Sequence, residues 1–148
     1  MLRYMRIAAH LANSPASHAV TLRTAGNMQS LAVGAKVTGG SAVNGGEFLM
    51  LALATCYCND LYREAARRGI VVTAVEVEAS AEFAAPGLAA SDIRYRARVD
   101  SPAPAAEIEA LLRETDAVAE IHNTVRAGLA VHRDDWVDAP VVAKAGGN

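Results

Sequence analysis

The sequence predicts an α+β fold in which antiparallel strands surround one long, buried helix. Three patterns lead to this prediction: an apolar helical stretch in the middle of the chain, short alternating segments before it, and two longer alternating segments after it. Alternation of apolar and polar residues is typical of strands with one buried face. With 148 residues, of which 52% are hydrophobic, the chain is expected to form a single domain, 1–148, with a modest core.

The long helix is predicted between Asn44 and Gly69. Asn44 is expected to cap the first turn with its side-chain oxygen, and Glu47 to reach back to the Asn44 amide, which is the capping-box pattern. Gly69 can adopt the left-handed conformation that ends a helix. Residues 48–54 are apolar on every side, so the helix is expected to be buried all round. Charge returns at Asp60, after about a dozen residues, whereas a membrane span needs roughly 20.

Charge and cysteine usage exclude several classes of protein. Fourteen Lys and Arg are balanced by sixteen Asp and Glu with no basic run, so neither nucleic acid nor an anionic membrane is an expected partner. Arg3 and Arg6 interrupt the apolar N-terminus, so no signal peptide is expected, and a cytoplasmic protein with reduced thiols is. Cys56 and Cys58, two residues apart on the predicted helix, point to nearly opposite sides and cannot form a disulfide.

Before the helix, the sequence predicts a three-stranded meander. Strands are expected at 6–12, 18–24 and 28–33, with turns at 13–17 and 25–27. A connection rich in small residues then leads into the helix.

After the helix, segments 71–83 and 93–99 alternate strictly and are predicted to pair as antiparallel strands around a loop that contains Pro86 and Gly87. The polar face of the first strand carries glutamates and that of the second carries arginines, which favours the antiparallel register. These residues are Glu76, Glu78, Glu82, Arg94, Arg96 and Arg98.

Two further helices are predicted near the C-terminus. Residues 101–104, with two prolines, open the first helix. Thr115 or Asp116 is expected to cap the second, which ends at Gly128.

The last residues have weaker patterns. Short strands are predicted at 129–131 and 136–142, and residues 144–148 are expected to fray.

The order of these elements and two local motifs resemble the OsmC/Ohr family of osmotically induced and organic-hydroperoxide-resistance proteins. The first motif is the helix entry Asn44-Gly45-Gly46-Glu47, followed by an apolar run into Ala54-Thr55-Cys56. The second is His122-Asn123-Thr124-Val125-Arg126-Ala127-Gly128, which looks like the family segment just after its second cysteine. The resemblance spans roughly residues 6–131, and it implies an OsmC-like fold.

The resemblance implies thiol peroxidation, in which a thiolate attacks the distal oxygen of an organic hydroperoxide and becomes a sulfenic acid. Cys56 matches the attacking cysteine. The family's second cysteine falls at about Ala119, so an external thiol is expected to resolve the sulfenic acid. The activating glutamate of the hydroperoxide-resistance branch falls at Gly46, with Glu47 one step out of register. The activating cation falls in the first hairpin, where His18 is the first candidate and Arg23 a weaker one.

Each of these residues also has a structural interpretation. A buried helical cysteine often packs as a small hydrophobe, and Asp60, one turn beyond Cys56, disfavours the thiolate. Glu47 fits a helix cap, and packing is the expected role of Cys58. No metal or cofactor is expected, because the histidines have no metal-ligand spacing. They are His10, His18, His122 and His132.

These patterns leave two candidate functions. The first is a Cys56-dependent peroxidase for hydrophobic organic hydroperoxides. The second is a non-catalytic protein that binds a small apolar ligand at a subunit interface lined by Cys56. The family forms an intertwined dimer, and a helix that is apolar on all sides needs more cover than one small chain provides, so an obligate homodimer is expected.

Overall fold

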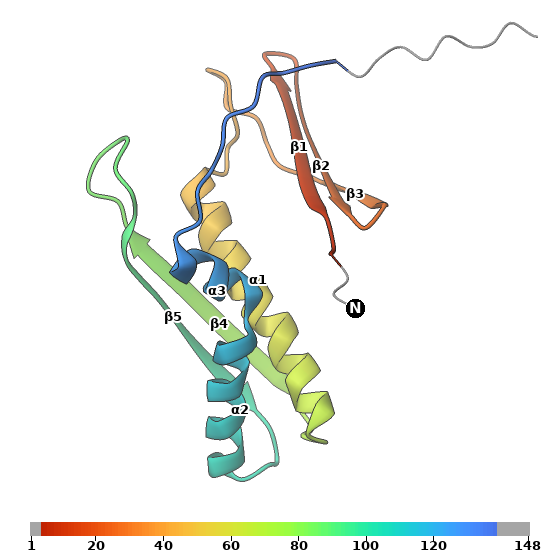
Figure 1. Ribbon diagram of the computed structural model, residues 1–148, viewed down its shortest axis with the longest axis vertical. Coiled ribbons are helices and arrows are strands. Elements are labelled where there is room, and N and C mark those ends of the chain that lie inside the picture. The colour runs from red at the N-terminus through yellow and green to blue at the C-terminus, as the bar shows by residue number, and fades with distance from the viewer. Residues whose placement is uncertain (1–3, 139–148) are drawn as a thin grey trace, which may run out of the picture.

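The computed structural model describes residues 4–138, which form five antiparallel strands and three helices (Figure 1). This arrangement confirms the α+β prediction. The strands are β1 (Ile7–Ser14), β2 (Ser17–Thr24), β3 (Asn27–Leu31), β4 (Ala74–Glu82) and β5 (Ser91–Asp100). The helices are α1 (Gly45–Arg67), α2 (Ala105–Val118) and α3 (Glu120–Ala127).

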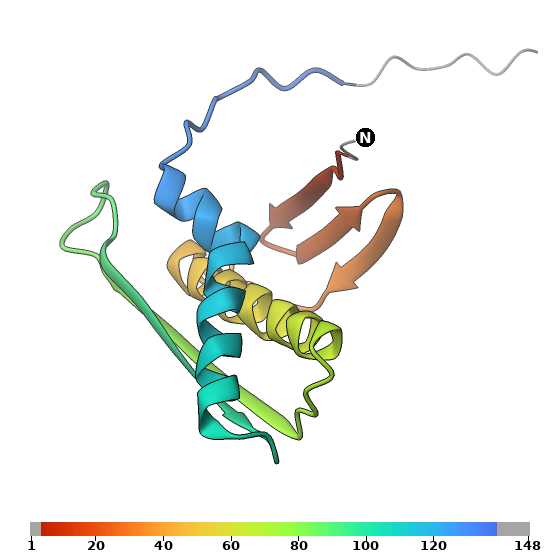
Figure 2. The ribbon, with the colours of Figure 1, turned by 60° about the horizontal axis from the view of Figure 1, so that its bottom comes forward.

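The meander β1-β2-β3 lies to one side of α1, and the hairpin β4-β5 lies to the other (Figure 2). In the register of the meander, one face carries mostly apolar side chains. We call this set the meander face; it consists of Ile7, Ala9, Leu11, Val20, Leu22 and Leu31. Ile7 is 65% exposed and Leu11 54%, so the chain leaves much of this face uncovered.

The ends of α1 agree with the prediction. The Glu47 backbone N–H donates to Asn44 Oδ1 at 2.8 Å, and the Asn44 N–H donates to Glu47 Oε1 at 3.1 Å, which completes the capping box. After the last turn, Gly69 has φ 67°, in the left-handed region that glycine adopts without strain.

The prediction that α1 is buried on all sides is wrong for the single chain. Its buried residues are Leu53, Tyr57, Asp60, Leu61 and Ala65, whereas Leu51 is 58% exposed. The reason is geometric, because β4, α2 and α3 pack against α1 and leave another side open.

The β4-β5 register confirms two of the three predicted charge pairs. Glu76 faces Arg98 and Glu78 faces Arg96, and both pairs form ion pairs. The third pair is absent, because the register shifts between Ser80 and Glu82 and places Glu82 opposite Ser91. Arg94 pairs instead with Asp92 at 2.6 Å.

The boundary between α2 and α3 also differs from the prediction. Neither Thr115 nor Asp116 is a cap, because α2 continues through both to Val118. Thr115 is fully buried, and its hydroxyl donates to the Leu111 carbonyl one turn earlier at 2.7 Å. The N-cap of α3 is Ala119, and α3 ends before Gly128, as predicted.

Residues 129–138 contain no strand, so the strand predicted at 129–131 is wrong. This stretch runs past the meander, where the rings of His10 and Trp136 are 6.2 Å apart. Residues 136–138 of the second predicted strand are also irregular, and the rest of that strand and the predicted frayed end lie outside the described residues. Among the described helices, none is long and apolar enough to cross a membrane.

The core lies between α1, α2 and the apolar face of β4-β5. It consists of Tyr57, Leu61, Ala65, Leu111 and Ala119. The chain exposes 11767 Å² in total, whereas a compact monomer of this mass exposes about 7,200 Å². The residues outside the described range cannot account for this excess, because a wholly exposed chain presents only about 1.45 Å² per dalton.

Candidate functional site

Cys56 lies in the middle of α1, and its side chain reaches the start of α3. Its Sγ is 3.5 Å from Asp60 Oδ2, one turn further along α1, and 3.8 Å from Glu120 Oε2, the first residue of α3. The thiol is half-buried and reduced. The two carboxyl groups are therefore the hydrogen-bond acceptors of the Cys56 thiol within the described chain.

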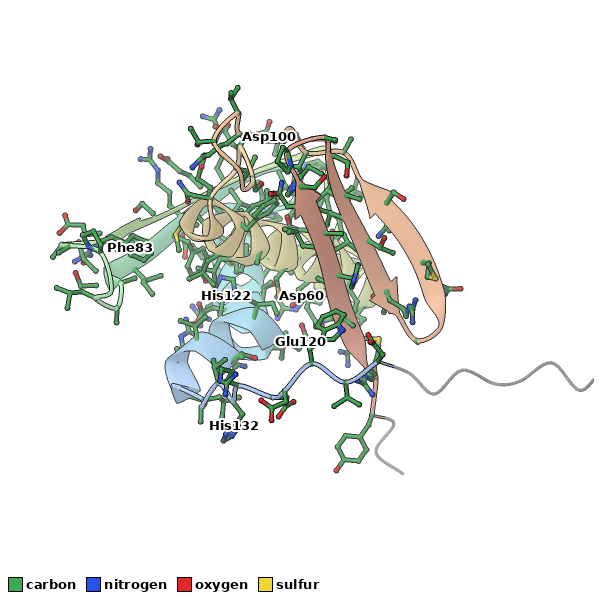
Figure 3. The ribbon with its side chains drawn as sticks, turned by 90° about the horizontal axis from the view of Figure 1, so that it is seen from above. Asp60, Phe83, Asp100, Glu120, His122 and His132 are labelled. Carbon is green, nitrogen blue, oxygen red and sulfur yellow. The ribbon has the colours of Figure 1, made fainter. Side chains whose placement is uncertain are left out.

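A single guanidinium group joins the two carboxyl groups. Arg63 Nη1 is 2.9 Å from Asp60 Oδ1 and 3.8 Å from Glu120 Oε1. Asp60 is only 4% exposed, so this ion pair offsets part of the cost of burying its charge. The Arg63 Nε also donates to Glu64 at 3.3 Å, which holds the guanidinium in place. Figure 3 shows Asp60 and Glu120 beside each other, with His122 set apart from them.

The electrostatic environment disfavours the Cys56 thiolate. Burial raises the pKa of the Cys56 thiol, and the charges of Asp60 and Glu120 raise it further. Hydrogen bonding by the backbone N–H of Ile121 opposes this rise of the pKa. The balance keeps the thiol protonated in its resting state.

The two carboxyl groups differ from each other. Burial and a hydrogen bond with Glu120 raise the pKa of Asp60, and Arg63 only partly opposes the rise. The pKa of Glu120 is lowered by its own backbone N–H and by hydrogen bonding from Asp60. The two carboxyl groups therefore titrate as a pair, and the burial of Asp60 disfavours the state in which both are ionised.

The sulfur also lies near the N-terminus of α3. The N-cap of α3, Ala119, has no side chain that can accept from the first-turn amides. The Ile121 N–H, in the first turn of α3, lowers the pKa of Cys56 and so favours its thiolate. The amides and the dipole at a helix N-terminus stabilise a nearby anion, so α3 favours the Cys56 thiolate. The helix α1 does not, because Cys56 lies in its interior, far from its N-terminus.

A second cluster holds α3 in this position. The ring of His122 lies 4.5 Å from that of Tyr95 and 5.8 Å from that of Tyr57. The Tyr95 hydroxyl donates to Asp116, which also pairs with Arg126 at 2.7 Å. Burial lowers the pKa of His122, and both of its ring nitrogens lack a polar partner, so the ring packs as a neutral aromatic group.

The residues predicted for activation have other partners in the chain. Glu47 belongs to the helix cap. His18 Nδ1 lies 3.0 Å from Asn13 Nδ2, and Arg23 Nη2 donates to Met28 Sδ at 3.4 Å. These residues therefore make no hydrogen bond to Cys56 within the described chain.

Gly46 occupies the position where the resemblance places an activating glutamate, and the site has little room for a side chain. An added Cβ atom would lie 3.2 Å from the Phe83 ring and 3.3 Å from Asn44 Oδ1. A side chain at this position would require the Phe83 ring and Asn44 to shift slightly.

The position expected for a second cysteine, Ala119, is fully buried in the core cluster against which Cys56 packs. The packing therefore brings this position and Cys56 to the same region of the core. Cys58 is half-buried and follows Cys56 by two residues on α1.

Cys56, Asp60 and Glu120 are also a group whose potential metal-ligand atoms lie within 4.8 Å of one another. Arg63 already supplies the positive charge that a metal ion would bring to these carboxylates. In the sequence, the spacing of one helical turn identifies Asp60 as a neighbour of Cys56. Sequence patterns missed Glu120, which is 64 residues from Cys56, because no local pattern reports a contact between α1 and α3. Arg63 was also missed, although its spacing of three residues from Asp60 on α1 is a signal that could have found it.

The sequence model of the family described as OsmC-like protein matches residues 38–132, which include both motifs and the whole Cys56 site. The chain belongs to this family. Among curated proteins, none matches the sequence.

Solved structures of OsmC-like proteins share the fold. An OsmC-like protein from Mycoplasma pneumoniae is 18% identical, with a TM-score of 0.62, and the match covers 85% of this chain and 89% of that chain. An OsmC-like protein of unknown function from Vibrio cholerae is 13% identical, with a TM-score of 0.51 and coverage of 83% and 94%. An OsmC-like hydroperoxide resistance protein from Jannaschia sp. is 15% identical, with a TM-score of 0.50 and coverage of 93% and 95%.

Proposed function

We propose that this OsmC-like protein is a cysteine-based peroxidase that reduces organic hydroperoxides at Cys56. The observation that carries the proposal is the polar environment of the thiol, which lies between two carboxyl groups at the start of α3 rather than among aliphatic side chains alone. Membership of the OsmC-like family supports it, as does the fold shared with a hydroperoxide resistance protein.

The catalytic cycle we propose needs an external thiol. Cys56 would become a sulfenic acid, and Cys58, two residues further along the same helix, is poorly placed to condense with it. One external thiol would form a mixed disulfide with Cys56 and release water, and a second would restore the Cys56 thiol. The cytoplasm, where thiols are kept reduced, is the compartment that suits this cycle.

We further propose that the working form is a homodimer. The uncovered meander face and the open side of α1 are apolar surfaces that a monomer rarely exposes to water. Obligate dimers bury about 2,000–5,000 Å² or more in total, about half of it on each partner. The excess of exposed area of one chain over that of a compact monomer is large enough to supply one partner's share. A second copy would also bring another His18 and Arg23, the residues expected to activate Cys56, which have other hydrogen-bond partners within the described chain.

A specific observation favours the second candidate function, which is the binding of a small apolar ligand without turnover. The raised pKa of Cys56 makes the thiolate scarce, and no cation within the described chain hydrogen-bonds the sulfur directly. In this alternative, Cys56 lines a pocket at the dimer interface and does not react.

The test is turnover of cumene hydroperoxide with dithiothreitol as reductant. The wild-type protein is expected to consume the hydroperoxide and, without reductant, to form a sulfenic acid that dimedone traps at Cys56. Cys56→Ser should abolish both consumption and labelling, and Cys58→Ser is the matched control that should preserve them. Consumption by the wild type no faster than by Cys56→Ser would contradict the peroxidase proposal and leave the binding function.

A further inference from the structure

We propose that Asp60 and Glu120 form a proton relay for the reaction at Cys56. The pair accepts the thiol proton as the sulfur attacks and donates a proton to the oxygen that leaves. This inference rests on the proposed peroxidase function, and it assigns catalytic roles to two residues that the resemblance does not point to.

The geometry places all three groups in one contact. Cys56 Sγ is 3.5 Å from Asp60 Oδ2 and 3.8 Å from Glu120 Oε2. The sulfur and one oxygen of each carboxyl group lie within 4.8 Å of one another. Because Asp60 comes from α1 and Glu120 from α3, the relay exists only where these two helices meet (Figure 3).

The charges around the pair favour retention of a proton. The groups that face the two carboxyls are Cys56 and Arg63 from α1, and Arg63 is itself paired with Glu64. One guanidinium balances one carboxylate, and a second ionised carboxylate at this distance is costly when Asp60 is buried. The raised pKa of Asp60, caused first by burial, agrees with a pair that shares one proton.

The reaction balances with the proton count of the pair unchanged. As the Cys56 sulfur forms a bond with the terminal oxygen of R–O–OH, the O–O bond breaks and its electron pair leaves on the RO oxygen. The thiol proton moves to the free carboxylate of the pair, and the proton already on the pair moves to the RO oxygen. The sulfur is oxidised to Cys56–S–OH, and the hydroperoxide is reduced to the alcohol ROH.

The relay answers a problem that the site itself creates. The burial of the sulfur and the two neighbouring carboxyl groups make both a free thiolate and a free alkoxide unfavourable, so neither should form without proton transfer in the same step. Positioned acid and base groups typically accelerate such reactions by about 10²–10⁴-fold. Water can replace an exposed relay member more easily than a buried one, so Asp60 is expected to matter more than Glu120.

The test separates proton transfer from the reactivity of the thiol. Asp60→Asn and Glu120→Gln are compared with the wild type in the reduction of cumene hydroperoxide, whose leaving alkoxide needs a proton, and of peracetic acid, whose leaving acetate does not. Alkylation of Cys56 by iodoacetamide, which releases iodide, reports on the thiolate alone. We expect Asp60→Asn to slow cumene hydroperoxide reduction by about 10–100-fold, to slow peracetic acid reduction much less, and to leave alkylation unchanged or faster.

Glu114→Gln is the matched control, because Glu114 pairs with Arg68 and lies outside the cluster around Cys56. It should preserve all three rates. Glu120→Gln should show the same pattern as Asp60→Asn with a smaller loss, and it tests the relay even if loss of the buried Asp60 impairs folding. The relay is wrong if both variants reduce cumene hydroperoxide as fast as the wild type, or if all three rates fall by the same factor. An inactive wild type would instead refute the peroxidase function, and the relay with it.

Discussion

The meander and the hairpin β4-β5 are both amphipathic sheets, but only the hairpin is covered within its own chain. Val77 on β4 packs against the core, whereas Leu11 on β1 is 54% exposed. The difference lies in what packs on each sheet, because α1 contacts β4 closely and the meander face carries no comparable layer within the described chain (Figure 2). An alternating pattern therefore predicts that a face needs cover, but it does not identify the segment or the subunit that covers it.

The candidate site residues also divide between these two regions. Cys56, Asp60 and Glu120 belong to the packed part of the chain, whereas His18 and Arg23 belong to the meander. If a second copy covers the meander face, the surroundings of Cys56 depend on association as well as on folding. Substitutions in the meander and in the packed part of the chain can separate effects on association from effects on folding.

The largest effect is expected from a charge on the meander face. Leu11→Asp should convert the proposed dimer to a monomer, because an aspartate without a partner is costly to bury in an interface. Light scattering at micromolar concentration measures the change. Glu76→Gln, on the exposed face of the hairpin, is a control that should leave the dimer intact. A wild-type protein that is a monodisperse monomer under these conditions would contradict the proposed dimer.

A cavity in the packed part should act on folding rather than on association. Leu111 is fully buried, so Leu111→Ala is expected to lower the free energy of unfolding by about 2–5 kcal/mol. Urea denaturation at fixed protein concentration measures this loss. Leu11→Ala is the counterpart on the meander face, and it should shift the dimer dissociation constant more than Leu111→Ala does. A larger shift of the dissociation constant in Leu111→Ala than in Leu11→Ala would contradict a dimer interface at the meander face.

A smaller effect on stability, but a clear chemical one, is expected from Ala119→Cys. Ala119 belongs to the core cluster against which Cys56 packs, and it precedes Glu120, whose carboxylate lies 3.8 Å from the Cys56 sulfur. Peroxide is therefore expected to link Cys56 to the introduced cysteine in a disulfide within one chain. Mass spectrometry of non-reduced peptides identifies this link. Cys58→Ser in the same background should not prevent it. A dimedone-reactive sulfenic acid that persists in Ala119→Cys would show that the two positions do not meet.

Much of the fold could be predicted because its signals are local. The capping box at Asn44 and Glu47 and the left-handed Gly69 depend on neighbouring residues, and the structure has both. The predicted register of β4-β5 failed only at Glu82, where the register shift breaks the simple count. The predicted cap at Thr115 was wrong because this side chain is buried inside α2 and its hydroxyl bonds to the Leu111 carbonyl. The sequence pattern alone could not distinguish a capping threonine from one that is buried within a helix.

By itself, the sequence determined the position and ends of the central helix, the two sets of strands and the placement of Cys56 within α1. These follow from hydrophobic period and from contacts between residues a few positions apart. Only the tertiary structure decided that α1 has an open side and that Glu120 joins Asp60 and Arg63 around the thiol. The physical reason is that the sulfur of Cys56 and the carboxylate of Glu120 are 64 residues apart in the chain, and the packing of α3 on α1 alone brings them within 3.8 Å.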